Sequence, residues 1–88
     1  MTESAARRTV EVRVELKPGI FDAEAESVVK SLRLLGIPHV AGVSTGRLYQ
    51  LTFEGVSAEE ASALAAKAVD QLLANPVVHQ VVVGPPVG

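Results

Sequence analysis

Few side chains in this sequence stand in patterns that support catalysis or metal binding. The two histidines, His39 and His79, could bind a metal ion together with a carboxylate, because imidazole and carboxylate groups are common metal ligands. They stand, however, at corresponding places in two similar halves of the chain, residues 9–45 and 47–83. That placement favours shared architecture over a binding site, and we predict no metal site.

The hydroxyl and carboxyl groups also argue against an active site. No serine lies in the G-x-S-x-G pattern that exposes a nucleophile, and the sequence contains no cysteine. Asp22, Glu24 and Glu26 form an acidic cluster, but acidic residues are typical of the first turn of a helix. Residues 44–47 (STGR) could bind an anion through backbone N–H groups, yet their length suits a hairpin turn better. We therefore predict neither catalytic nor cofactor-binding residues.

Charge and composition exclude further classes. The chain has 8 Lys and Arg against 10 Asp and Glu, a net charge of −2, whereas nucleic-acid-binding domains normally carry a basic excess. Aromatic residues make up only 3%, too few for bases to stack on a sheet. No apolar run is long enough to span a membrane, and the first eight residues lack the apolar run of a signal peptide. We expect a cytoplasmic protein that binds neither nucleic acid nor membrane.

The first half of the chain predicts a strand, a helix and a hairpin. Residues 9–17 alternate apolar and charged side chains, which is typical of a strand with one covered face. Asp22 is a plausible N-cap for a helix over 22–35, which Gly36 and Pro38 would end. Residues 39–45 and 47–53 then predict two strands joined by a tight turn at Thr45-Gly46.

The second half repeats the strand–helix–strand order. Ser57 and Glu60 have the spacing of a capping box at the start of a helix over 57–75. Alanines on its apolar stripe allow this helix to lie close against a sheet. Asn75-Pro76 ends the helix, and the valine-rich residues 77–83 predict the last strand.

This order predicts the α+β class. The expected architecture is a ferredoxin-like two-layer sandwich of βαββαβ order, with a four-stranded antiparallel sheet and both helices on one face. We expect a single domain over residues 9–83, a disordered tail over 1–8 and a second tail over 84–88.

The last strand predicts contact with another chain. Val77, Val81 and Val83 alternate with Val78 and Val82, so one of the two sets must lie outside the monomer core. Exposed valines on an edge strand favour pairing with another chain, which predicts a homo-oligomer. Leu34, on the polar side of the first predicted helix, is a further contact candidate.

The sequence also resembles a known family over residues 10–83. It is similar to PurS, the small subunit of bacterial and archaeal phosphoribosylformylglycinamidine (FGAM) synthase. It differs where the family often has Pro and Gly (here Ala23 and Ala25), a basic residue (Ser44) and an acidic residue (His79). The resemblance is carried by Lys17-Pro18-Gly19, Asp22, Ser31-Leu32, Leu35-Gly36, Gly46-Arg47 and the run Leu72-Leu73-Ala74-Asn75-Pro76-Val77.

The resemblance implies a non-catalytic adaptor in de novo purine synthesis. Such a subunit forms dimers or tetramers and holds the synthetase subunit (PurL), which uses ATP and magnesium, to the glutaminase subunit (PurQ). It binds no cofactor of its own, although it is required by an ATP-dependent ligase. The candidate contact residues are Lys17, Asp22, Leu34, Arg47, Val78 and Val82. The alternative is an ACT-like regulatory module, which has the same element order and binds a small ligand at a dimer interface.

Overall fold

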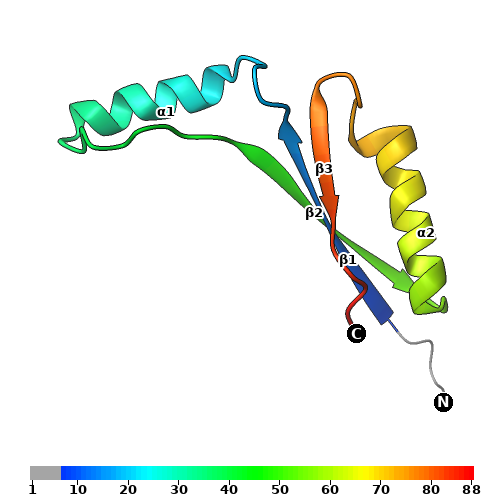
Figure 1. Ribbon diagram of the computed structural model, residues 1–88. Helices are drawn as coiled ribbons and strands as arrows, with labels where there is room; N and C mark the ends of the chain where they lie inside the picture. Colours follow the sequence, from blue (N-terminus) through cyan, green and yellow to red (C-terminus); the bar gives the residue numbers. More distant parts are fainter. Residues whose placement is uncertain (1–6) are drawn as a thin grey trace.

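The alternating segment at the start of the chain forms the central strand of a three-stranded antiparallel sheet, in the order β2-β1-β3 (Figure 1). The structure, a computed structural model, describes residues 7–88. Its two helices and its sheet confirm the α+β class. The elements are β1 (Arg7–Leu16), α1 (Ala23–Leu34), β2 (Gly46–Glu54), α2 (Ala58–Ala68), a π-helical turn η1 (Val69–Leu73) and β3 (His79–Val83).

The inward face of β1 forms the core. Val10, Val12 and Val14 are buried there and pack against Ala61 and Ala65 of α2, both of which are also buried. An alanine side chain is a single methyl group, so the backbone of α2 lies close to the sheet. The expected role of the alanines is confirmed.

The predicted starts of both helices and the end of the first are confirmed in atomic detail. The second helix, predicted over 57–75, is α-helical over Ala58–Ala68 and continues as the π-helical turn η1 to Leu73. The carboxylate Oδ1 of Asp22 accepts a hydrogen bond from the backbone N–H of Ala25 at 2.9 Å, which caps α1. Gly36, just beyond α1, has φ +87°, the left-handed conformation that ends many helices. At the start of α2, Ser57 Oγ accepts from the N–H of Glu60 at 3.0 Å, and the Glu60 carboxylate accepts from the N–H of Ser57 at 3.1 Å. This is the predicted capping box.

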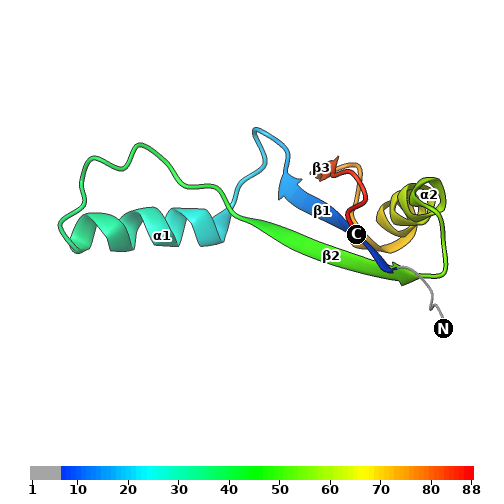
Figure 2. The same ribbon diagram turned by 90° about the horizontal axis from the view of Figure 1, so that it is seen from below.

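Residues 22–45, which we call the arm, extend away from the sheet (Figures 1 and 2). Within the described residues α1 makes no extensive contact with any strand or with α2, whereas α2 packs on β1. The radius of gyration is 17.5 Å and the chain measures 56 × 28 × 15 Å. A compact chain of this length would have a radius of gyration of about 12 Å. The chain is therefore open, with one helix on the sheet and the other outside it.

The prediction of a hairpin at Thr45-Gly46 is wrong for the described chain. Gly46 is not among the glycines with positive φ; it begins β2 and pairs with Glu15. A β-carbon at Gly46 would lie 3.0 Å from the Val14 carbonyl oxygen, so glycine there favours close approach to β1 rather than a turn. The chain thus enters β2 from the arm without reversing its direction (Figure 1). For that reason residues 39–45 join no sheet, and only α2 covers the sheet.

The last strand divides its valines between the two faces of the sheet. Val81 and Val83 pair with Val14 and Val12 and share their face, while Val82 pairs with Arg13 on the opposite face and is 58% exposed. This confirms that some valines of residues 77–83 remain outside the core.

Residues of both predicted tails belong to the sheet region around β1. Backbone hydrogen bonds join Val87 to Thr9 and Gly84 to Glu11, so residues 84–87 follow β1. Of the tail expected over residues 1–8, Arg7 and Arg8 begin β1, and residues 1–6 lie outside the described residues. No helix in the part of the chain that the structure describes is long and apolar enough to cross a membrane.

Candidate subunit-contact surfaces

The end of the sheet from which the arm leaves gathers several predicted contact residues. We call this surface the arm base and define it by Lys17, Asp22, Thr45, Arg47 and His79. Lys17 follows β1, and Asp22 and Thr45 stand where the arm begins and returns. Arg47 and His79 stand near the starts of β2 and β3. A hollow of about 360 Å³ opens beside it, and its lining includes Val14, Leu16, Glu24, Thr45, Arg47, Tyr49, Leu73 and His79.

Asp22 ties the two ends of the arm together. Its Oδ2 accepts hydrogen bonds from the Thr45 hydroxyl at 2.7 Å and from the Thr45 N–H at 3.2 Å, while Oδ1 caps α1. These bonds favour the charged carboxylate, and the Thr45 hydroxyl is the main reason that the pKa of Asp22 lies below its ordinary value. One carboxylate therefore starts the helix and also holds the returning chain in place.

Lys17 and Val78 are joined by their backbones. The N–H of Lys17 donates to the carbonyl oxygen of Val78 at 2.8 Å, so the turn before β3 lies against the end of β1. The Lys17 side chain is exposed and Val78 is half-buried. Arg47, the second residue of β2, is also exposed. The structure thus brings four of the six predicted contact residues, Asp22 included, to one end of the sheet.

The other two predicted contacts lie elsewhere. Leu34 stands at the far end of α1 and is 89% exposed. Val82 lies on the face of the sheet that α2 leaves uncovered, beside Arg13 on β1, and Arg13 is in turn opposite the exposed Leu48 on β2. This row of valine, arginine and leucine gives the uncovered face an amphipathic centre.

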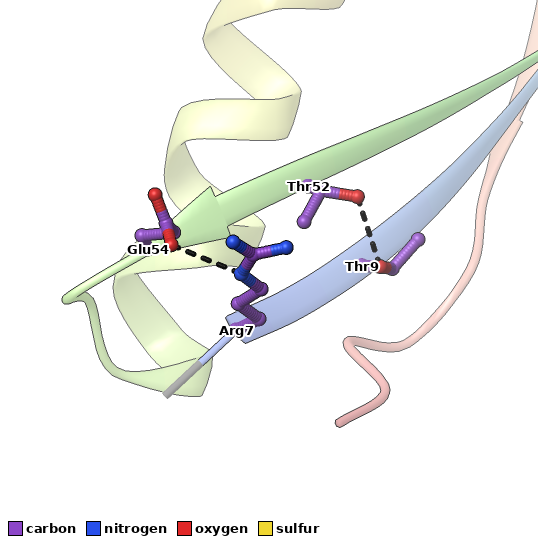
Figure 3. A network of polar contacts seen from close by, with 4 residues as sticks. All are labelled: Arg7, Thr9, Thr52 and Glu54. Atoms are coloured by element: carbon purple, nitrogen blue, oxygen red, sulfur yellow. Dashed lines mark hydrogen bonds and ion pairs between the residues drawn. The ribbon is translucent and has the colours of Figure 1, made fainter. Parts of the chain in front are cut away.

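Around that row the uncovered face is polar. Gln50 donates to Glu11 and Gln80 donates to Glu15 across neighbouring strands, at 3.3 and 3.4 Å. Towards the end of the sheet remote from the arm, Figure 3 shows the Arg7–Glu54 ion pair at 2.9 Å and the contact between the Thr9 and Thr52 hydroxyls at 3.1 Å. Exposed pairs of this kind contribute little to stability. They make the face compatible with water and with a polar partner.

The two histidines do not meet. His39 is exposed on the returning part of the arm, whereas His79 begins β3, where its Nδ1 accepts a hydrogen bond from the N–H of Asn75 at 2.9 Å. His79 is therefore part of the turn that leads into the last strand. Among residues 7–88 no group of three histidine or carboxylate side chains lies close enough to hold a metal ion.

Two residues of this region escaped the sequence reasoning. Thr45 was expected in a hairpin turn, and nothing in the sequence pairs it with Asp22, which is 23 residues away. Gly46 was assigned a turn because glycine is typical of turns, although a close approach between two strands needs glycine just as much. In both cases the missing information is a contact between distant segments.

Comparisons with known proteins agree on one family. The family model "PurS: Phosphoribosylformylglycinamidine (FGAM) synthase" matches residues 9–84. The phosphoribosylformylglycinamidine synthase subunit PurS of Archaeoglobus fulgidus is 43% identical over 70 residues, which is 80% of this chain and 88% of that protein.

Solved structures share the fold. The PurS subunit of Thermotoga maritima matches with a TM-score of 0.82 at 25% identity, over 94% of this chain and 95% of that one. A chain in the structure of PurLQS from Thermotoga maritima also gives a TM-score of 0.82 at 25% identity, over 91% of this chain and 98% of that one. Because the family match spans most of the chain and the fold agrees over nearly all of it, the chain belongs to the PurS family of FGAM synthase subunits.

Proposed function

We propose that this chain is the non-catalytic adaptor subunit of a glutamine-dependent FGAM synthase in purine biosynthesis. In this role it holds a synthetase subunit (PurL) to a glutaminase subunit (PurQ), so that ammonia passes between them. The observation that carries the proposal is the likeness, over 91% of this chain, to a chain of the PurLQS structure. The family match over residues 9–84 favours this role over the ACT-like regulatory module.

The physical contribution of such a subunit is proximity. Ammonia released into water is protonated and diluted, so its source and its consumer must be docked to each other. An adaptor supplies this geometry without forming bonds itself. The arm base suits the task because Asp22 is held by three hydrogen bonds, and the exposed cations Lys17 and Arg47 lie at the same end of the sheet.

The six predicted contact residues divide into three separate contacts in this proposal. Lys17, Asp22 and Arg47 form a polar contact at the arm base, with Val78 held next to Lys17 by a backbone hydrogen bond. Leu34 offers an apolar contact at the far end of α1, and Val82 offers one on the uncovered face of the sheet. The contact at Leu34 lies at the far end of the arm and the other two lie on the sheet, so the subunit is able to touch two partners at once.

The proposal has several further parts. The protein acts in the cytoplasm as a homo-oligomer, a dimer or a tetramer, and residues 9–83 form its single domain. The synthetase subunit, not this chain, binds ATP and magnesium. The four-stranded ferredoxin-like sheet belongs to the assembled state, in which residues 39–45 supply the fourth strand.

The test is reconstitution with the synthetase and glutaminase subunits in the presence of glutamine, ATP and magnesium. We expect a stable complex of all three chains, and we expect glutamine-dependent synthesis to require this chain while synthesis from added ammonia does not. Leu34→Ser should weaken both the complex and the glutamine-dependent reaction. The matched control is Leu72→Ser, because Leu72 is also exposed, at 82%, but lies at the end of η1. Failure to form the complex would overturn the proposal.

A further inference from the structure

The turn that leads into β3 closes on a histidine ring. The N–H of Asn75 donates to Nδ1 of His79 at 2.9 Å, and the N–H of His79 donates back to the carbonyl oxygen of Asn75 at 2.8 Å. The N–H of Val78 donates to the same carbonyl oxygen at 3.1 Å, and the N–H of Val77 donates to the Asn75 side chain at 3.0 Å. Residues 75–79, which we call the β3 turn, are therefore held by a network in which the His79 ring is an acceptor.

The ring must be neutral for this network to exist. A backbone N–H only donates, so Nδ1 of His79 carries no proton and the neutral ring has its proton on Nε2. A protonated imidazole has an N–H on both nitrogens and cannot accept a hydrogen bond. Protonation would therefore set two donors against each other and leave the N–H of Asn75 without this acceptor. Histidine is the side chain that normally changes its charge between pH 5 and 8, so mild acid is able to alter the β3 turn.

Charged side chains lie around His79 on the walls of two hollows. One is the hollow beside the arm base, and the other, of about 360 Å³, lies between η1 and β3. The residue paired with His79 on β1 is the apolar Leu16. Because the charges on these walls are two of each sign, the lost hydrogen bond, and not a local excess of charge, sets the response of the turn to acid. These charged residues are Glu24, Asp70, Lys17 and Arg47.

The β3 turn holds one end of the pairing between β1 and β3. The carbonyl oxygen of Val78 accepts from the N–H of Lys17 at 2.8 Å, and His79 begins the strand beside it. Farther along, Val81 and Val83 pair with buried valines of β1. Loss of the turn would therefore open the start of β3 while the rest of the strand stays in the sheet. The part that opens lies at the end of the sheet from which the arm leaves (Figure 1).

We propose that His79 is a pH-sensitive switch for the arm base. With the ring neutral, the β3 turn is closed, and Val78 and Lys17 are held against each other by their backbones. With the ring protonated, the turn opens and this part of the contact surface loses its fixed shape. Subunit contacts at the arm base are therefore strongest near neutral pH and weaken in mild acid. The switch is a property of the isolated chain, whereas its effect on docking rests on the proposed adaptor function.

NMR of the unmodified chain tests the switch. The ring signals of His79 and the amide signals of Asn75 and Lys17 are followed from pH 8 to pH 5.5, a range in which Asp22 stays charged. We expect both amide signals to move together with protonation of the His79 ring. The protection of the Lys17 amide against hydrogen exchange, corrected for the intrinsic rate at each pH, should fall by at least about fivefold, the factor for loss of one ordinary hydrogen bond. Amide signals that do not follow the ring, or unchanged protection, would overturn the proposal.

Two matched variants separate His79 from the other titrating groups. In His79→Asn the amide oxygen is attached to Cγ, as Nδ1 is in histidine, so it is able to accept from the N–H of Asn75 at every pH. His39→Asn removes the other histidine, which is exposed on the arm. We expect the pH dependence to disappear in His79→Asn and to persist in His39→Asn. The reverse result, or persistence in both variants, would assign the effect to another group and refute the switch.

Complex formation with the synthetase and glutaminase subunits shows whether the switch acts on docking. Between pH 7.5 and pH 6 the affinity of the unmodified chain should fall about threefold more than that of His79→Asn, and equal falls would refute the effect on docking. A turn that responds to pH in a chain that forms no complex would refute the adaptor role alone. A complex whose β3 turn does not respond to pH would refute the switch alone.

Discussion

Replacing Val12 with alanine removes two methyl groups from the most enclosed part of the core. Val12 is 0% exposed and pairs with Tyr49 on one side and Val83 on the other. The loss of transfer free energy is about 1.6 kcal/mol, at roughly 0.8 kcal/mol for each buried methyl group. The total reaches about 3 kcal/mol if the surrounding side chains do not collapse into the cavity. A domain of this size has a total stability of roughly 4–13 kcal/mol, so the loss is a large fraction of the whole.

The measurement is urea unfolding followed by circular dichroism at a fixed chain concentration. The matched control is Val82→Ala, which removes the same two methyl groups from the uncovered face, where Val82 is 58% exposed. We expect Val82→Ala to lower the free energy of unfolding by less than about 1 kcal/mol, and Val12→Ala to lower it by about 1.6–3 kcal/mol. An equal loss of stability in the two variants would refute the assignment of the two faces of the sheet.

Two further predictions concern the arm base and the entry into β2. The pKa of Asp22 lies below its ordinary value of 3.8, mainly because of the Thr45 hydroxyl. The contribution of the Asp22 carboxylate to the stability of the fold is therefore complete above pH 3.8 and is lost as the pH falls through the lowered pKa. The amide signal of Thr45 in NMR should follow this loss, and Asp22→Asn should abolish the dependence; a transition at or above pH 3.8 would contradict the contact. Gly46→Ala should lower the urea midpoint, because its β-carbon would lie 3.0 Å from atoms of β1, whereas Gly42→Ala meets nothing within 4 Å and should be neutral or slightly stabilising. Equal midpoints in the two alanine variants would show that the approach at Gly46 is not tight.

The sequence-based predictions were correct for features that depend on residues close together in the sequence and wrong where distant residues decide. The strand β1, the cap at Asp22 and the capping box of Ser57 and Glu60 were all predicted correctly. Each depends on residues within a few positions of one another. The hairpin prediction at Thr45-Gly46 used the same local reasoning and was wrong, because the direction of the chain there depends on contacts with Glu15 and Asp22.

The candidate contact surface was predicted in part. Predicted contact residues came from the resemblance, from turn composition and from the valine-rich last strand, and the structure places four of them, Lys17, Asp22, Arg47 and Val78, at one end of the sheet. None of these sources indicated that Thr45 would bind Asp22, since a hydrogen bond between residues far apart in the chain leaves no local pattern. The sequence predicted that one of two alternating sets of valines would lie outside the core, but not that it would be the set with Val82, because the strand over 77–83 is apolar on both faces.

The amino-acid sequence by itself determined the two helices and three paired strands in their order, the starts of the helices and the apolar face of β1, whereas the strand it predicted over 39–45 joins no sheet in the described chain. These follow from side-chain periodicity and from capping groups, which act over one or two turns of helix or a few residues of strand. Only the tertiary structure decided that the arm leaves the sheet, that Asp22 holds its return, and which valines of β3 face inward. Those outcomes depend on hydrogen bonds and packing between segments far apart in the chain, where small differences in free energy select one arrangement among several that have the same local pattern.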